Sequence, residues 1–448
     1  MEGSTSEPTS LHSASRASRS ARPKLVNPIE NAIRSWLQIL PHELLNGVDS
    51  WLEVLLSRAP KRWVVYSPMV LLPPGSFGEE WWKVVDSKQV ASKHIDELWV
   101  LLLDSIERRE GKGPLTHLAV NSGIPFHKTP SPGSGSQEHS KPTDEENCGD
   151  NIQTPSGKIP DQGANSDGDT LSGSEENILR TPSGLIIIHG DFGPSLSPET
   201  VPTARDFEEA FWVSTKQNGI TQIWAPRYTM FSRGNVKEKA RLLDFHNSNQ
   251  KLQSRSLPKE KVANNSAVDL YAGIGYFVFS YVKMGMRRVV GWELNPWSVE
   301  GLRRGAIANG WSVKIVRTHE VLDLVEAQIV VVLEDNKKAV QRLRSFGRYK
   351  LGVIRHVNCG LLPTSEDSWE MSLEMLDGDG WLHLHQNVGV NDVQARIAEI
   401  EELFMCWLRR TQDDRVAEVE HVEYVKTFAP GVWHCVFDVY ICRPHRDE

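Results

Sequence analysis

From residue 263 onward, short apolar runs alternate along the chain with segments whose apolar residues recur at helical spacing. Such alternation of strands and helices is typical of a mostly parallel sheet covered by helices. An amphipathic helix over 394–408 and a final antiparallel hairpin close the chain. The pattern predicts an α/β, Rossmann-like fold. The predicted strands are 267–271, 288–293, 328–333, 352–358 and 381–385, the hairpin strands are 419–428 and 433–442, and the earlier helices are 276–283, 296–309 and 337–343.

Upstream, the apolar pattern predicts a second, smaller folded unit. Residues 28–127 carry three helical patterns, two short strands and no catalytic constellation, so we expect an N-terminal accessory domain of α+β type. The segment 178–262 holds an Asn-Gly hairpin signal, since both turn positions tolerate positive φ. We assign this segment as the substrate- and cofactor-positioning part of a catalytic domain, 178–448, whose Rossmann-like core is 263–448. The accessory helices are 31–40, 48–56 and 95–107, and its strands are 63–66 and 69–72.

Two segments lack the apolar residues that folding requires. Residues 1–27 are rich in Ser, and we predict a disordered tail; a mitochondrial presequence is the alternative, which Glu2 and Glu7 disfavour. Residues 128–177 contain no aromatic residue, so burial cannot offset their ordering entropy and we predict a disordered acidic linker. The linker holds ten Asp/Glu against three Lys, a net −7 of the chain's −8. The acidic balance of the whole chain therefore does not exclude a nucleic-acid partner.

Composition narrows the cellular context. No run of about 18 apolar residues is present, which argues against a membrane-spanning helix, and the N-terminus lacks the apolar region of a secretion signal. The cysteines form no CxxC pair, which argues against a disulfide framework or a structural zinc site. We therefore expect a cytoplasmic protein with no membrane partner, and no obligate protein partner is evident. The five cysteines are Cys148, Cys359, Cys406, Cys435 and Cys442.

The stretch from Asp269 to Gly275 lies where the first core strand should end and a helix should begin. Gly273 and Gly275 allow a tight turn and a close approach to a ligand. Glu293 follows 24 residues after Asp269, at the end of the next strand, where an acid accepts hydrogen bonds from a ribose diol. A dinucleotide fingerprint wants a third glycine, and Val278 stands there instead. These features predict a site for S-adenosylmethionine, whose ammonium group needs a nearby carboxylate or carbonyl.

A second polar group, Glu334-Asp335-Asn336, directly follows the predicted strand 328–333. At the carboxyl end of a sheet strand, such side chains face the ligand crevice, where they are expected to bind the adenine amine. The alternative is that Asp335 or Asn336 caps the next helix, a role for which both residue types are well suited. The two roles are compatible.

The loop 358–365, Asn-Cys-Gly-Leu-Leu-Pro-Thr-Ser, follows the fourth predicted strand. Amino- and guanine-directed methyltransferases often carry an Asn/Asp-Pro-Pro-aromatic loop at this place. Gly360 and Leu361 stand where the prolines would be, which disfavours methylation of a base amine. A plain strand-to-helix connection remains the alternative.

Three further residue types invite a chemical role. His383 and His385 alternate on one strand, so both imidazoles point to the same face. No carboxylate completes a ligand set nearby, so we expect no metal and favour core or substrate-facing histidines. Cys359 as a nucleophile is the weakest candidate.

The stretch 225–241 mixes aromatic residues with basic ones. It is either a solvated charge run or a loop and helix start that bind a carboxylate or phosphate. Its charges are Arg227, Arg233, Lys237, Lys239 and Arg241.

Six ordered blocks of this sequence resemble one family. They are 225–239, 269–277, 293–296, 334–336, 360–365 and 383–387. Together they resemble the wybutosine-synthesising enzymes of eukaryotes, the tRNA(Phe) 4-demethylwyosine aminocarboxypropyltransferases. This family is related to the tRNA guanine-N1 methyltransferases and shares their class I methyltransferase fold. The resemblance covers roughly residues 180–448 and, more weakly, 63–77.

The resemblance implies a reaction and a set of site residues. S-adenosylmethionine would donate its 3-amino-3-carboxypropyl group to the tricyclic modified guanosine 3′ of the anticodon of tRNA(Phe), releasing methylthioadenosine. In this family the residues that match Ser232, Lys239, Glu293, Asp335 and Asn336 contact the cofactor. Glu293 would hold the ribose, Asp335 and Asn336 the adenine, and Ser232 and Lys239 the amino-acid part. No catalytic residue or general base is assigned.

The partner and two rival functions complete the predictions. Binding of tRNA should rest on basic contacts to phosphates, with Arg227, Arg233, Arg287, Arg288, Arg303, Arg304, Lys337 and Lys338 as candidates. A tRNA guanine methyltransferase of the same fold is the alternative enzyme, and a non-catalytic binding module is the other alternative.

The interval from Glu293 to Asp335 is longer than the interval usual in the family that the sequence resembles. The third core strand is therefore either 313–316 or 328–333. We choose the latter, because it leads into Asp335.

Overall fold

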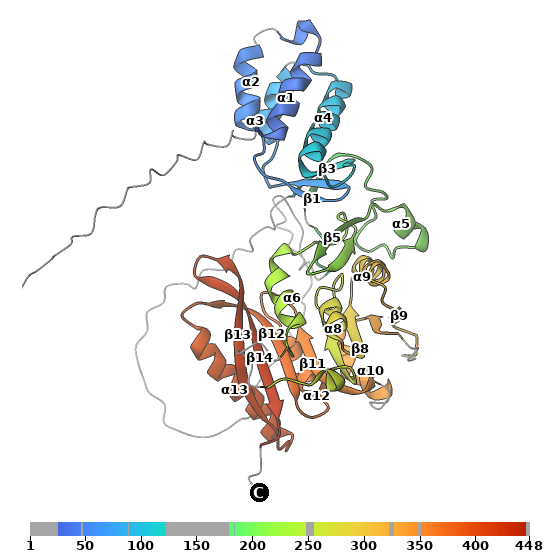
Figure 1. The fold of residues 1–448 in the computed structure, drawn as a ribbon, viewed down its shortest axis with the longest axis vertical. Helices are drawn as coiled ribbons and strands as arrows, with labels where there is room; N and C mark the ends of the chain where they lie inside the picture. The colour runs from blue at the N-terminus through green and yellow to red at the C-terminus, as the bar shows by residue number, and fades with distance from the viewer. Residues whose placement is uncertain are drawn as a thin grey trace, which may run out of the picture.

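The computed structural model describes residues 26–45, 48–87, 89–121, 179–182, 184–247, 255–321, 327–346 and 351–444 (Figure 1). Nearly all of the predicted tail and the whole predicted linker lie outside the described residues. Within the described part, no helix is both long and apolar enough to cross a membrane. An eight-stranded sheet dominates the C-terminal half, and a helical unit with its own small sheet stands above it in Figure 1.

The large sheet has the strand order β13-β14-β12-β11-β7-β8-β10-β9. Six strands from β9 to β12 run parallel, and β14 and β13 add an antiparallel hairpin at one edge. This arrangement confirms the predicted Rossmann-like α/β fold with its terminal hairpin. The strands are β7 Asn265–Asp269, β8 Arg288–Glu293, β9 Val313–Arg317, β10 Ile329–Leu333, β11 Val353–Cys359, β12 Gly380–Gly389, β13 Val416–Ala429 and β14 Val432–Cys442.

The near-continuous apolar strands are explained by helices on both faces of the sheet. Successive residues of a strand point to opposite faces, so Ala267 packs with α8 and α9 while Val268 packs with α10, α12 and α13. The residues of β10 alternate between the same two faces of the sheet. One face carries α6 Val236–Leu243, α8 Val278–Met284 and α9 Pro296–Ala308; the other carries α10 Ala339–Phe346, α12 Trp369–Met375 and α13 Val393–Arg410.

Both candidates for the third core strand form strands. β10 pairs with β8 and leads into Asp335, as predicted, whereas β9 adds an edge strand beyond it. Short helical elements complete the core: α7 Lys259–Val262 and the 3-10 turns η2 Arg233–Asn235, η3 Asn336–Lys338 and η4 Glu366–Ser368.

The N-terminal unit is a small four-stranded sheet covered by helices, in the order β1-β2-β3-β4. Its last strand comes from beyond the linker and pairs antiparallel with β3. Residues 185–189, which the sequence placed in the catalytic domain, therefore complete the N-terminal sheet. The elements are α1 Pro28–Ile39, η1 His42–Leu45, α2 Val48–Ser57, β1 Val64–Tyr66, β2 Met69–Leu72, α3 Glu79–Ser87, α4 Ser92–Glu110, β3 His117–Asn121 and β4 Leu185–His189.

Two features of the remaining chain show how local sequence acts. The hairpin of β5 Val213–Gln217 and β6 Ile220–Trp224 turns at Asn218 and Gly219, whose φ values of 52° and 71° confirm the predicted turn. A short helix, α5 Ala204–Glu209, precedes it with a capping box at Thr203. The sequence pattern did not reveal α3, because only Trp81 and Val85 of this helix are buried and the apolar period lasts a single turn.

Candidate active site

The candidate site lies where the direction of strand succession reverses, between β7 and β11. From β7 the chain continues through β8 and β10 on one side and through β11 and β12 on the other. The carboxyl ends of parallel strands open a ligand crevice at such a point. Asp269 ends β7 and Asn358 lies near the end of β11, and the Asn358 Nδ2 donates to Asp269 Oδ1 at 3.0 Å. This side-chain hydrogen bond therefore adds to the backbone pairing that already joins the two strands at the reversal.

The predicted glycine loop needs both of its glycines. Gly273 and Gly275 have φ values of 52° and 91°, where side chains with a Cβ are strained. A Cβ on Gly275 would stand 2.6 Å from the ring of Phe279, and one on Gly273 would stand 3.0 Å from the ring of Tyr276. A side chain at either position would therefore both strain the backbone and crowd the neighbouring ring.

Two acids flank this loop with raised pKa values. Glu293 accepts from the Gly273 N–H at 2.7 Å through Oε2 and from the Asn295 N–H at 2.8 Å through Oε1. Burial nevertheless raises the pKa of Glu293, and burial raises the pKa of Asp269 to about 6 despite its bond from Asn358. Neither carboxylate forms an ion pair within the described residues.

The pair Asp335 and Asn336 lies beside the same loop. Asp335 Oδ1 accepts from the Lys337 N–H at 2.9 Å, so Asp335 caps the turn η3, as the alternative interpretation predicted. Asn336 Nδ2 donates to the Leu270 carbonyl at 2.9 Å. The neighbouring Glu334 is buried in an ion pair with Arg342. Contact of Asp335 and Asn336 with adenine stays a prediction.

Ser232 and Lys239 reach the glycine loop through Tyr276. The Ser232 N–H donates to the Tyr276 Oη at 3.1 Å, and that hydroxyl donates to the Met230 carbonyl at 2.6 Å. The Lys239 Nζ lies 5.6 Å from the centre of the Tyr276 ring and 5.4 Å from that of Phe231. All eight predicted cofactor residues thus lie in or close to the stretch 269–277. Those that do not contact this stretch themselves are next to a residue that does.

Lys239 is a buried cation without a counter-ion among the described residues. Its side chain sits on α6 and is 3% exposed. The ammonium donates to Gln217 Oε1 at 2.6 Å and to Gln222 Oε1 at 2.9 Å, both on the β5–β6 hairpin. Burial lowers the pKa of Lys239 to about 8. Neutral amides therefore hold this charge in place and leave it available to an anionic group.

The predicted histidines are core residues of a hydrogen-bonded network. His383 Nδ1 lies 2.6 Å from Asp438 Oδ1, and His385 Nε2 lies 3.2 Å from Asn358 Oδ1. Of the described residues, no group of three or more His, Cys, Asp or Glu is placed to hold a metal ion. Burial raises the pKa of the Cys359 thiol to about 12, which disfavours a nucleophilic thiolate.

Several residues that contact the predicted site residues could not be identified from the sequence. Tyr276, Gln217, Gln222 and Asn358 hold predicted site residues in place but were given no role. The available signal was weak: Gln222 is a polar residue on the inward side of a hairpin strand, and Asn358 is a polar residue ending an apolar strand. Their partners are far away in sequence, so spacing alone could not pair them.

The candidate RNA-binding cations divide by exposure. Arg288 is buried and its Nε donates to the Ala327 carbonyl, which removes it from the set. Arg303 and Arg304 both pair with Glu300 on α9. Arg227 is half-buried. The exposed candidates are Arg233, Arg287, Lys337 and Lys338, of which Arg233, Lys337 and Lys338 lie on the crevice side and Arg287 precedes β8 at the opposite edge.

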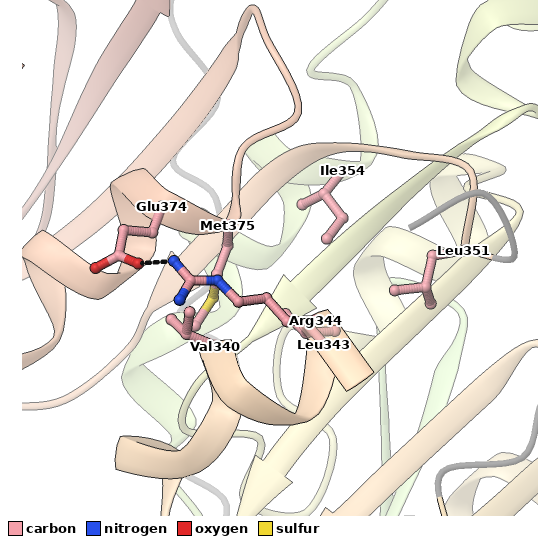
Figure 2. Close-up of a pocket in the computed structure, with 7 residues that line it drawn as sticks. All are labelled: Val340, Leu343, Arg344, Leu351, Ile354, Glu374 and Met375. Carbon is pink, nitrogen blue, oxygen red and sulfur yellow. Dashed lines mark hydrogen bonds and ion pairs between the residues drawn. The ribbon is translucent and has the colours of Figure 1, made fainter. Parts of the chain in front are cut away.

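A small hollow elsewhere in the domain is not part of this site (Figure 2). Its volume is about 10 Å³, which is room for about one water molecule. It lies between α10, α12 and the amino end of β11, whereas the crevice lies at the carboxyl ends of the strands. The lining residues are Val340, Leu343, Arg344, Leu351, Ile354, Glu374 and Met375, with Arg344 and Glu374 joined in an ion pair.

Known proteins resemble this chain along most of its length. It is similar to tRNA wybutosine-synthesizing protein 2 from Schizosaccharomyces pombe, with 35% identity over 85% of this chain and 72% of that protein. The protein of the same name from Saccharomyces cerevisiae has 35% identity over 59% of this chain and 57% of its own. No family model matches. A solved structure from Pyrococcus horikoshii, provisionally described as a transferase, is 14% identical and has a TM-score of 0.50, covering 93% of this chain and all of its own, a likeness of fold alone.

Proposed function

Because the chain belongs to the tRNA wybutosine-synthesizing protein 2 family, we propose that it is an S-adenosylmethionine-dependent aminocarboxypropyltransferase. It transfers the 3-amino-3-carboxypropyl group to 4-demethylwyosine, the tricyclic guanosine derivative 3′ of the anticodon of tRNA(Phe). The other product is methylthioadenosine. The observation that carries the proposal is Lys239, a buried ammonium that has no carboxylate partner among the described residues and lies beside a cofactor loop.

The crevice offers a complementary group for each part of S-adenosylmethionine. Glu293 is oriented by two backbone N–H groups, and its remaining lone pairs accept the ribose hydroxyls. Asp335 and Asn336 lie at the end of the neighbouring strand for the adenine amine. Lys239 receives the carboxylate of the amino-acid part. Ser232 lies on the same side, because its N–H donates to the hydroxyl of Tyr276, whose ring faces the Lys239 ammonium. Asp269 supplies the buried acid at the start of the loop.

The choice of transferred group follows from position. A sulfonium has three electrophilic carbons, and the one that reacts is the one held in line between the nucleophile and the sulfur. An anchor for the carboxylate at Lys239 fixes the far end of the amino-acid chain. It thereby restricts where the γ-carbon stands. The ring carbon of the acceptor base attacks this γ-carbon, the carbon–sulfur bond breaks, and the ring carbon then loses its proton.

A two-label transfer assay tests the reaction. Precursor tRNA is incubated with the protein and S-adenosylmethionine labelled separately in the methyl and in the carboxyl carbon. We expect carboxyl label in the tRNA and methyl label only in methylthioadenosine. Methyl label in the tRNA would instead identify a tRNA guanine methyltransferase. Absence of any transfer together with absence of cofactor binding by calorimetry would favour a non-catalytic module.

The proposal includes the tRNA and the cellular location. A member of this family acts on tRNA, and two exposed cations at the crevice side, Arg233 and Lys337, are available to phosphates, whereas Lys338 is paired with Glu334. The restriction to tRNA(Phe) rests on the resemblance of the sequence blocks. A cytoplasmic location rests on composition and on cysteines without CxxC spacing. Imaging of the tagged full chain would check the location.

A further inference from the structure

Three polar side-chain atoms at the end of the sheet are buried without a hydrogen-bond partner among the described residues. They are Nδ2 and Oδ1 of Asn387, near the end of β12, and Nδ1 of His434, near the start of β14. Asn387 and His434 are directly opposite each other in the antiparallel ladder. Their side chains therefore stand next to each other on one face of the sheet. Burial of polar atoms without partners is unfavourable, which points to a group that binds them.

The cluster of Asn387 and His434 borders the cofactor crevice. Residues 381, 383, 385 and 387 share a face, and Trp381 packs with α6 and α8, so Asn387 lies on that face. The Asn387 N–H donates to the Pro363 carbonyl in the loop after β11. Lys426, the β13 partner of His434, places its Nζ 3.5 Å from the Ser232 Oγ. The predicted cofactor residue Ser232 and the loop 358–365 thus flank the cluster.

A chain of hydrogen bonds determines which nitrogen of His434 carries its proton. Asn358 Nδ2 donates to Asp269, so the Asn358 Oδ1 turns toward His385 and accepts from its Nε2–H at 3.2 Å. His385 Nδ1 is then an acceptor, and the His434 Nε2–H donates to it at 2.9 Å. The remaining nitrogen of His434, Nδ1, carries a lone pair. The cofactor residue Asp269 therefore sets the tautomer of His434 through two intervening side chains.

The free atoms define the chemistry of the missing partner. His434 Nδ1 and Asn387 Oδ1 accept hydrogen bonds, and Asn387 Nδ2 donates one. A carboxylate only accepts and cannot satisfy this set. A nucleobase that carries ring N–H and carbonyl groups can, and side-chain amides pair with such edges. Phe277, whose ring lies 5.0 Å from that of His385, adds an aromatic surface nearby.

We propose that Asn387 and His434 form the subsite that holds the acceptor base of the tRNA, turned out of its stack toward the cofactor. The inference rests on the proposed function for the identity of the base. It goes further by naming the side chains that bind it. No residue in this subsite was among the sequence candidates.

The test measures how much the base itself contributes to tRNA binding. Precursor tRNA(Phe) with 4-demethylwyosine is compared with the same tRNA carrying an abasic site there, both with saturating methylthioadenosine. The wild-type protein should bind the base-bearing tRNA about tenfold more tightly or better. Asn387→Ala and His434→Gln should lose this difference while binding the abasic tRNA as before. His434→Gln keeps an N–H for His385 and has no acceptor at the Nδ1 position, since both polar atoms of the glutamine amide lie one position further out.

Gln386→Ala is the matched control, because Gln386 is next to Asn387 in sequence and points to the opposite face, where it binds Thr364 and Glu366. It should keep the full preference for the base. A preference that persists in both subsite variants, or its absence in the wild-type protein, would overturn the inference. The inference would also be overturned if the two subsite variants bound S-adenosylmethionine more weakly but kept the preference for the base. That result would assign the free atoms of Asn387 and His434 to the cofactor. Because binding is measured without transfer, a failed two-label assay leaves this test intact.

Discussion

Among the residues that the structure describes, the buried charges at the predicted cofactor crevice have no counter-charges, whereas those between α6 and β14 are paired. At the crevice, burial raises the pKa of Asp269 to about 6 and lowers the pKa of Lys239 to about 8. Beneath α6, Arg241 binds Asp438 at 2.5 and 3.0 Å and Glu238 at 2.7 and 2.9 Å. Burial by itself would raise the pKa of Asp438, yet Arg241 and His383 hold that pKa well below its usual range.

The difference separates a structural cluster from the proposed binding site. Paired charges satisfy each other, so breaking the pair leaves an uncompensated charge inside the protein. Unpaired charges already carry the cost of burial and gain from a charged ligand. Each cluster takes its basic residue from the same short helix, since Lys239 and Arg241 are two residues apart on α6. Their roles therefore depend on the partners that the fold supplies and not on residue type.

The largest effect is expected at the paired cluster. Asp438→Ala should lower the free energy of unfolding by about 3–5 kcal/mol, because it leaves the Arg241 guanidinium buried with one fewer counter-charge. Urea unfolding measures this. Asp414→Ala is the matched control, since Asp414 forms an exposed pair with Arg443 at 3.4 Å and should change stability by about 1 kcal/mol or less. Equal effects of the two variants would mean that the cluster between α6 and β14 does not support the fold.

The next effect concerns the ligand and not the fold. Lys239→Met should weaken S-adenosylmethionine by about 1.5–3 kcal/mol and leave methylthioadenosine unchanged, since the latter lacks the carboxylate. Glu293→Ala should instead weaken both by about 1–3 kcal/mol, because both ligands carry the ribose. Calorimetry gives all four affinities. Lys237→Met, at an exposed neighbour paired with Glu423, is the control and should alter neither ligand. Equal loss of both ligands in Lys239→Met would place Lys239 away from the amino-acid part.

The smallest effect depends on pH. The folded-state pKa of Asp269, about 6, exceeds its ordinary value of 3.8, so the unfolded state releases this proton first as pH rises. The wild-type protein then loses stability relative to Asp269→Asn between about pH 4 and pH 6. Above pH 6 the variant should be more stable by about 1–3 kcal/mol, and the gap should close below pH 4. Urea unfolding of both proteins across this range tests it; a gap independent of pH would contradict the assigned burial of the charge.

Part of the site was predictable because it depends on local sequence. Gly273 and Gly275 adopt positive φ to make a tight turn, which depends only on the local backbone. Glu293 ends the next strand at a spacing that one helix and one turn determine. The Asn-Gly turn of the β5–β6 hairpin is local in the same sense. Both capping and ligand contact were foreseen for Asp335, and the cap is present. These features could be inferred because each needs only a few consecutive residues.

Other features involve partners that are far apart along the chain. β4 joins the N-terminal sheet across the linker, although its apolar run alone is equally suited to the catalytic domain. Arg241 and Asp438, which are 197 residues apart, become a pair only when β14 lies under α6. Asn387 and His434 face each other through strand register, which spacing in the sequence does not reveal.

The sequence by itself determined the alternation of strands and helices, the glycine loop and the acid on the following strand. These follow from apolar periodicity and backbone conformation, which act over a few residues. The tertiary structure alone decided that Lys239 is a buried cation with no counter-charge in the described part of the chain and that Arg241, two residues away, is paired. Burial and charge balance are properties of the packed surroundings, so two similar side chains on one helix acquire different roles only when the chain is folded.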